Sequence, residues 1–287
     1  MAEEVGQVGL RREVVDKTIK GFAVQNYKFK QALTENTTGG WDNTFYTEDS
    51  SVLSTPRGTK VKGIPRGANF PQASVNWTKQ TKALEKYGIE DNIFWEDILT
   101  NNIDVQGRTM FRLAEKVTKQ VDDEIFDTLT QGLVPTTMGS VMIGAGSSWN
   151  GANPNILDNL MEAKEKMSNF NYDTSNAMAF ISPKDHRSMV SYLSNKGAQF
   201  PQISEGVTMN GNIGKLAGVN LIQSNSVTAN YALMVVPKVV GTWKAAVPLR
   251  TEVIVDPMKS VKIRCAEIGV TQLTDPQASV LISGTQV

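Results

Sequence analysis

Apolar side chains recur at steps of three, four and seven residues in two long segments, which is the spacing of one helix face. The first stripe predicts a helix over residues 11–33, ended by two glycines. The second predicts a helix over 103–131, about 43 Å long at 1.5 Å per residue. Its stripe consists of Met110, Ala114, Val117, Val121, Ile125 and Leu129. This length exceeds the span of a small domain.

The second half of the chain mixes shorter helices and strands. A helix is predicted over 155–169, and another over 182–195 with Ser182 as its N-cap and Pro183 in its first turn. Between them "NAMAFISP" has the continuous apolar character of a buried strand. Short β-type runs fill the chain after residue 218. The order of a β-hairpin, a long helix, a mixed middle and a β-rich end predicts an α+β fold.

Residues 44–84 are poor in apolar side chains and carry prolines and glycines around their middle. The flanking stretches, "NTFYTEDSSVLS" and "ASVNWTKQTKAL", are β-type. We interpret the segment as an extended hairpin with a long irregular tip. Because an isolated two-stranded hairpin is marginally stable in water, we expect it to lie on another copy of the chain.

The hairpin segment is basic. Six basic residues and no acidic one lie between Ser50 and Leu84. Nucleic-acid contact is one interpretation, and contact with an acidic patch of a neighbouring subunit is the other. We favour the subunit contact, since the rest of the chain compensates the charge. The predicted contact residues are Arg57, Lys60, Lys62, Arg66, Phe70 and Trp77.

Composition narrows the protein class. The chain has 29 basic and 29 acidic residues, and this balance argues against a general nucleic-acid binder. Cys265 is the single cysteine, so neither an intrachain disulfide nor a cysteine metal site is possible. The N-terminus lacks the apolar run of a signal peptide, and no stretch has the roughly 20 apolar residues of a membrane span. We therefore expect no membrane association.

The sequence offers little catalytic chemistry. His186 is the single histidine, and its neighbours in "SPKDHRS" are too close along a helix to form a triad. The stretch "GNIGKLAG" resembles a phosphate loop, but Met209 and Leu216 occupy positions where that motif needs glycine and Ser or Thr. "GAGSSW" lacks the third glycine of a dinucleotide-binding motif.

A cluster of acids lies near the end of the long helix. Asp122, Asp123, Glu124 and Asp127 lack a histidine partner, so we interpret them as a solvated or ion-paired face. We thus predict no catalytic, cofactor-binding or metal site, and no enzyme activity.

Four stretches, in this order, resemble one family, the tailed-bacteriophage major capsid proteins, whose fold is shared with encapsulins and herpesvirus capsid floors. "LAEKVTKQVDDEIFDTLTQG" resembles the end of the family's spine helix, and "NAMAFISPKDHRSMVSYLSN" its axial strand and helix. "IGKLAGVNLIQSNSV" resembles the strand after the axial loop, and "EIGVTQLTDPQASVLIS" the closing strands. The resemblance covers nearly the whole chain.

The resemblance implies a layout. Residues 1–40 would be an N-terminal arm, and 41–84 an extended loop lying on a neighbour. Residues 85–154 and 245–287 would form a peripheral domain, with the spine helix at 103–131. Residues 155–244 would form an axial domain, whose loop 197–212 would point at the five- and six-fold axes.

The resemblance also implies a function. Hexamers and pentamers of the chain would close into an icosahedral shell around packaged double-stranded DNA, bound without sequence specificity. Scaffolding, portal and cement proteins are candidate further partners. The virion capsid would be assembled in the host cytoplasm, without a cofactor. An encapsulin-type compartment that encloses an enzyme cargo is the alternative.

Two family features are expected to be absent. The sequence begins at Met1, so we expect no proteolytic removal of an N-terminal scaffolding segment. Lys60 and Lys62 lie near the hairpin tip, but no residue pattern identifies an asparagine or an acid for covalent cross-linking, so we expect none.

Overall fold

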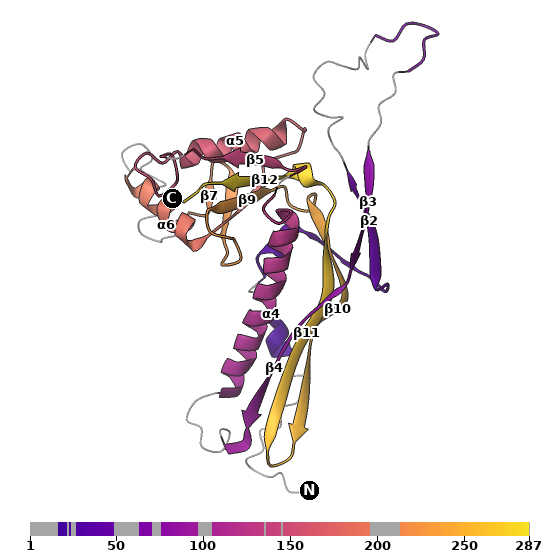
Figure 1. The fold of residues 1–287 in the computed structure, drawn as a ribbon, viewed down its shortest axis with the longest axis vertical. Coiled ribbons are helices and arrows are strands. Elements are labelled where there is room, and N and C mark those ends of the chain that lie inside the picture. The colour runs from indigo at the N-terminus through magenta and orange to yellow at the C-terminus, as the bar shows by residue number, and fades with distance from the viewer. Residues whose placement is uncertain are drawn as a thin grey trace.

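The computed structural model describes residues 17–21, 23, 27–48, 63–70, 76–96, 105–134, 136–144, 146–195 and 213–286. The fold is α+β, as predicted. In Figure 1 a long helix lies along an extended sheet, a second sheet with two helices sits at one end, and a hairpin projects beside them. Three sheets of four, six and two strands account for the strands of the described residues.

The long helix, α4 (Val105–Leu129), has 25 residues and is therefore about 37 Å long. The predicted apolar stripe is buried along its whole length, and Val121 and Ile125 have no exposed surface. The stripe packs on the four-stranded sheet and contributes to the core that extends into the second sheet. The prediction of this helix and of its buried face is confirmed.

The four-stranded sheet supports α4. Its order is β1 (Thr34–Thr37), β10 (Gly241–Asp256), β11 (Ser260–Leu273) and β4 (Glu85–Phe94). β10 and β11 form a long antiparallel ribbon, with register shifts around Val247 that interrupt its ladder. Half-buried and buried residues alternate along residues 260–268 of β11, so one face there lies under α4 and the other is partly open to solvent, whereas residues 269–273 are all buried.

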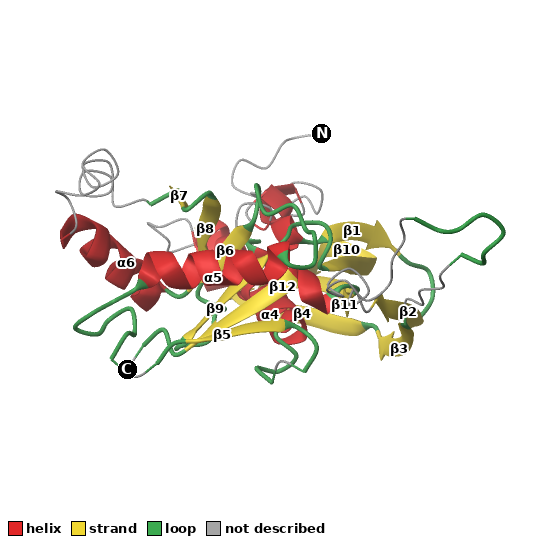
Figure 2. Ribbon diagram, turned by 90° about the horizontal axis from the view of Figure 1, so that it is seen from above, coloured by secondary structure: helices red, strands yellow, loops and turns green. Residues whose placement is uncertain are grey.

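The six-stranded sheet has the order β5-β12-β9-β6-β8-β7. Its strands are β5 (Gly139–Met142), β6 (Met178–Ile181), β7 (Lys215–Leu216), β8 (Val219–Gln223), β9 (Tyr231–Val235) and β12 (Ser279–Ser283). Helix α5 (Ile156–Ser168) packs across β5 and β12, and α6 (Pro183–Asn195) follows β6 (Figure 2). The turn at the predicted phosphate-loop-like stretch joins β7 to β8.

Both short helices form as predicted. Ser182 caps α6, because its Oγ accepts a hydrogen bond from the Asp185 amide at 3.2 Å and donates one to the Asp185 carboxylate at 2.7 Å. The buried Asp185 carboxylate also accepts a hydrogen bond from the Gln286 side chain. The C-terminal segment is thereby fixed to the start of α6.

The sheets divide the chain differently from the predicted boundaries. β5 and β12 come from the stretches expected to form the peripheral domain, 85–154 and 245–287, yet they pair within the six-stranded sheet. The short helix η2 (Pro276–Ala278) leads directly into β12. The assignment of peripheral and axial domains itself stays a prediction.

The helix predicted over 11–33 is wrong at its C-terminal end. The described residues 17–21 and 23 are helical, but the chain bends at Lys28, forms the 3₁₀ helix η1 (Phe29–Ala32) and enters β1. The carboxylate of Asp122 on α4 accepts hydrogen bonds from the amides of Lys28 at 2.9 Å and Phe29 at 3.3 Å. These amides are satisfied by α4 rather than by a continuing helix.

A buried polar group fixes the same segment to β11. The Glu267 carboxylate accepts hydrogen bonds from the Tyr27 hydroxyl at 2.5 Å and from the Lys30 ammonium at 2.6 Å. The Lys30 ammonium lies 3.6 Å from the ring centre of Tyr27 and 4.8 Å from that of Trp243. Because the charges are paired and hydrogen-bonded, their burial is tolerated and fixes where the N-terminal segment crosses the sheet.

Candidate assembly interface

The predicted hairpin is present. β2 (Asp42–Glu48) and β3 (Trp77–Ala83) pair antiparallel over seven residues each. Neither strand joins another sheet among the described residues, and Figure 1 shows the pair projecting beside the four-stranded sheet. Because successive side chains point to opposite faces, the register assigns each residue of the hairpin to one of two faces.

One face of the hairpin contacts its own chain. Asn43 is buried on this face, and the Thr47 hydroxyl donates to the Leu273 carbonyl at 3.2 Å. The Lys82 ammonium, opposite Asn43, binds Glu124 at 2.7 Å and the Thr128 hydroxyl at 2.9 Å on α4. Lys82, one of the six basic residues of the segment, is therefore paired within its own chain, and it anchors the base of the hairpin.

The other face, which we call the outward face, meets solvent. It carries Glu48 opposite Trp77, Tyr46 opposite Lys79, and Thr44 opposite Thr81. Trp77 is 56% exposed and Tyr46 is 53% exposed. The two aromatic residues are diagonal neighbours across the strands, close enough to form one apolar patch. Such a patch on a thin hairpin is typical of a protein–protein contact.

The six predicted contact residues fall into three groups by their position. Trp77 lies on the outward face, whereas Arg66 and Phe70 lie in the described part of the tip, 63–70, where both are exposed. The tip contains a turn in which the Ala68 amide donates to the Pro65 carbonyl at 3.0 Å and Gly67 has a φ of 83°. Arg57, Lys60 and Lys62 lie outside the described residues.

Tyr46 is an outward-facing residue that was not predicted from the sequence. "NTFYTE" contains two adjacent aromatic residues, and period two alone shows only that they point to opposite faces. The pairing of Tyr46 with Lys79 decides which of them is outward. Phe45, on the face that contacts its own chain, is half-buried.

The acid cluster of α4 is not the uniformly solvated or ion-paired face that was predicted. Asp123 pairs with Lys119 at 2.9 Å and Glu124 pairs with Lys82, as expected for a surface. Asp122 is buried and caps η1, and this burial raises its pKa to about 6, although the two amide hydrogen bonds partly offset the rise. Burial and then the neighbouring acids also raise the pKa of Asp127.

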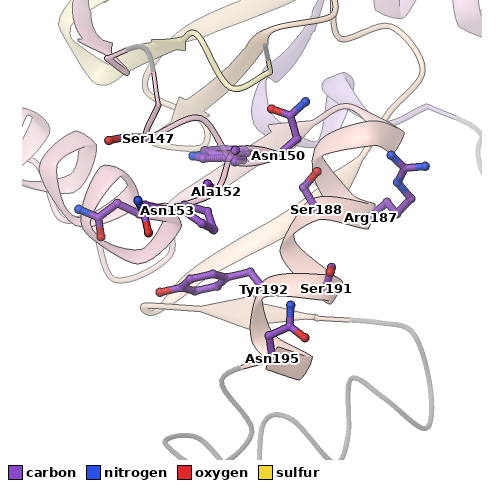
Figure 3. A pocket seen from close by; sticks show the side chains of 13 residues that line it. Ser147, Asn150, Ala152, Asn153, Arg187, Ser188, Ser191, Tyr192 and Asn195 are labelled. Atoms are coloured by element: carbon purple, nitrogen blue, oxygen red, sulfur yellow. The ribbon is translucent and has the colours of Figure 1, made fainter.

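A pocket of about 880 Å³ lies between α6 and the loop that precedes α5 (Figure 3). Serine and asparagine side chains dominate its lining, together with Tyr192 and a single cation, Arg187. Among the described residues that line it there is no histidine or acidic side chain, and the Ser188 hydroxyl donates to the Lys184 carbonyl rather than to a base. The pair of groups that activates a serine nucleophile is therefore not assembled in this lining.

Neither metal binding nor membrane crossing finds support in the part of the chain that the structure describes. Within it, no three His, Cys, Asp or Glu side chains gather as a metal site would require. No described helix is both long and apolar enough to span a membrane. His186 is half-buried on α6, which agrees with its interpretation as an ordinary helix residue.

Comparison with known proteins identifies relatives of this fold. A family model described as phage capsid protein matches residues 78–282. Among solved structures, the chain is similar to the capsid of the cyanophage P-SCSP1u, with a TM-score of 0.66 and 13% identity, covering 90% of this chain and 88% of that one. A Mycobacterium phage Che8 structure gives a TM-score of 0.66 and 14% identity, with 91% and 92% covered.

A virus-like particle from Pyrococcus furiosus is similar to the same degree. Its TM-score is 0.65 at 12% identity, with 94% of this chain and 98% of that chain covered. At these identities the structural matches establish the fold alone. No curated protein sequence matches the chain.

Proposed function

Since the chain belongs to the phage capsid protein family and is a subunit of a capsid shell, we propose that hexamers and pentamers of it form an icosahedral shell around packaged double-stranded DNA. The exposed outward face of the hairpin is the observation that supports this proposal most directly. Trp77 and Tyr46 are more than half exposed on a two-stranded sheet that would be marginal alone. A neighbouring subunit is the partner that would cover both.

The hairpin supplies reach as well as apolar surface. Lys82 anchors the base of the hairpin to α4, and the Thr47 hydroxyl, near the other end of the paired strands, binds the Leu273 carbonyl at the end of β11. The basic tip residue Arg66 and the exposed Phe70 would extend the contact on the neighbour, together with Arg57, Lys60 and Lys62. Overlap of this kind raises the area that each subunit buries, which a closed shell of many copies needs.

The remaining layout follows from this assignment. Residues 1–40 would act as an arm, 41–84 as the loop on the neighbour, and 155–244 as the axial domain around the symmetry axes. Residues 85–154 and 245–287 would form the peripheral domain. The role is structural rather than enzymatic, without a cofactor. Assembly in the host cytoplasm, with scaffolding, portal and cement proteins as further partners, belongs to the same proposal.

An encapsulin-type compartment is the second candidate. The similarity to the virus-like particle from Pyrococcus furiosus supports it, because that fold matches as well as the phage capsids do. The match of the phage capsid protein family over residues 78–282 favours the viral role. The contents of purified particles separate the two, since DNA supports the virus and a protein cargo supports the compartment.

Deleting residues 55–72 tests the hairpin contact. We expect a folded subunit with an unchanged melting temperature, since the tip contributes to neighbours rather than to its own core. Shell formation, followed by electron microscopy, should be lost. Particles of wild-type size from the deletion variant would refute the role of the tip while leaving the shell itself intact.

A further inference from the structure

The exposed face of α4 carries a row of cations along its N-terminal half. Arg108, Arg112, Lys116 and Lys119, which we call the basic stripe, are all exposed. Their spacing of four, four and three residues places them on one side of the helix. At 1.5 Å per residue they are about 6, 6 and 4.5 Å apart along the axis, a row about 17 Å long.

Acidic side chains compensate only half of the basic stripe. Glu115 is the single acidic residue between 107 and 120, and it pairs with Arg112 at 2.7 Å. Lys119 pairs with Asp123 further along the helix. Both pairs are exposed and thus worth at most about 1 kcal/mol. In the described part of the chain, Arg108 and Lys116 have no acidic partner.

The stripe does not serve the stability of α4. Cations are favourable near the C-terminus of a helix and acids near its N-terminus, because of the helix dipole. In α4 the order is reversed: the cations lie in the first half, the acidic residues 122–124 and 127 lie in the second, and the first turn has no acid. Nor does the stripe pack on the sheet, because the buried stripe of α4 faces it. This arrangement of charges lowers the stability of the helix, and a binding role explains its presence.

We propose that the basic stripe binds the phosphate backbone of packaged double-stranded nucleic acid, and that this face of α4 therefore lines the interior of the shell. The inference rests on the proposed function. Phosphates of one strand recur every 3.4 Å along the duplex axis, so cations about 6 Å apart match roughly every second phosphate. Such contacts position a duplex without reading its bases.

The chemistry of the stripe favours phosphate over an acidic protein segment. Protein partners are held by buried aromatic or aliphatic anchors in pockets. The one large apolar side chain exposed on α4 among the described residues is Phe111, and the Arg112 guanidinium lies over its ring at 5.8 Å. A row of long cations without a pocket suits a polyanion. It also reconciles DNA contact with a chain of zero net charge.

Salt dependence of duplex binding tests the stripe on the full-length chain. The probe is a fluorescent 20-bp duplex, titrated between 50 and 200 mM salt. Four phosphate contacts predict a slope of about −3.6 in log K against log salt, a loss of about 150-fold over this range. The triple variant Arg108→Gln, Arg112→Gln, Lys116→Gln should retain a slope of about −0.9 and a loss of about 3.5-fold.

A matched control removes three exposed cations elsewhere. The variant Lys184→Gln, Arg187→Gln, Lys215→Gln removes the same number of positive charges from α6 and β7, beside the six-stranded sheet. It should keep the wild-type slope of log K against log salt. Equal losses in both triple variants would overturn the proposal, as would competition by polyglutamate without any duplex binding. Glutamine is a good helix former. If the triple variant nevertheless unfolds, Lys116→Gln alone should reduce the slope by about 0.9, and an unchanged slope would refute the contact.

The nucleic-acid content of purified particles separates this inference from the proposed function. Shells of the triple variant should contain less nucleic acid than those of the control. If shells of both variants contain as much nucleic acid as wild-type shells, the proposed role of the basic stripe is refuted and the capsid role is unaffected. Absence of shells from the wild-type chain, also with a scaffolding protein present, would count against the capsid role, and the duplex titration would still decide the stripe.

Discussion

Replacing Trp77 by serine separates a role in assembly from a role in folding. The side chain is 56% exposed in the subunit. A tryptophan buries at most about 250 Å², so about 140 Å² remains for a neighbour to cover. At about 25 cal/mol per Å², complete burial would contribute about 3.5 kcal/mol per contact, or about 400-fold in its association constant. This is an upper value, because ordering the hairpin against a neighbour costs free energy.

The assay measures the subunit concentration at which shells first form, by light scattering with electron microscopy of the products. We expect Trp77→Ser to raise that concentration at least about tenfold, and the melting temperature of the unassembled subunit to stay within about 2 °C of wild type. Met142→Ser is the control, since Met142 is 85% exposed on the edge strand β5. It should change neither quantity.

Two results would refute this reasoning. An unchanged threshold would mean that the outward face stays exposed in the shell. A large fall in the melting temperature would mean that Trp77 supports the fold of its own chain. Tyr46→Ser should follow Trp77→Ser with a smaller effect, because its ring offers less area at a similar exposure.

The remaining predictions concern the core. Val121→Asp should unfold the subunit, because an unpaired charge would be buried on a face with no exposed surface; an unchanged melting temperature would contradict this. Gly269→Ala should strongly destabilise the subunit, since the added Cβ would lie 2.4 Å from the Trp243 ring. Gly39→Ala is the control, because nothing lies within 4 Å of a Cβ at that position. Equal denaturant midpoints of the two variants would refute the clash. Asp122 has a pKa raised from 3.8 to about 6, so its stabilising contribution is full below pH 4 and is lost as the pH rises through 6, by about 3 kcal/mol. The free energy of unfolding of Asp122→Asn should therefore increase relative to that of wild type between pH 4 and 7. A difference between the two proteins that stays constant over this range would refute the raised pKa.

Local pattern was sufficient to predict the helices. The stripe of α4 repeats over about five turns, and Ser182 with Pro183 defines the start of α6 from residues adjacent in sequence. Periodicity failed where a distant residue decides. The bend at Lys28 follows from Asp122, 94 positions away, and no property of residues 11–33 encodes that contact.

The strand β4 was missed for a different reason. Its sequence, "EKYGIEDNIF", is rich in charge and has a glycine, although Tyr87 and Ile93 are buried at period-two positions. Its partner β11 supplies the rest of the signal. The two strands are close at Gly88, where a Cβ would lie 3.1 Å from the Cys265 carbonyl. The outward face of the hairpin likewise depends on a register that only the pairing of both strands defines.

Electron microscopy of the full-length chain, expressed alone and accompanied by light scattering, tests the central claim most directly. Closed shells some tens of nanometres across are the predicted result, and their contents then distinguish packaged DNA from a protein cargo. A chain that stays a monodisperse monomer or small oligomer, at high concentration and also with a scaffolding protein present, would contradict the account.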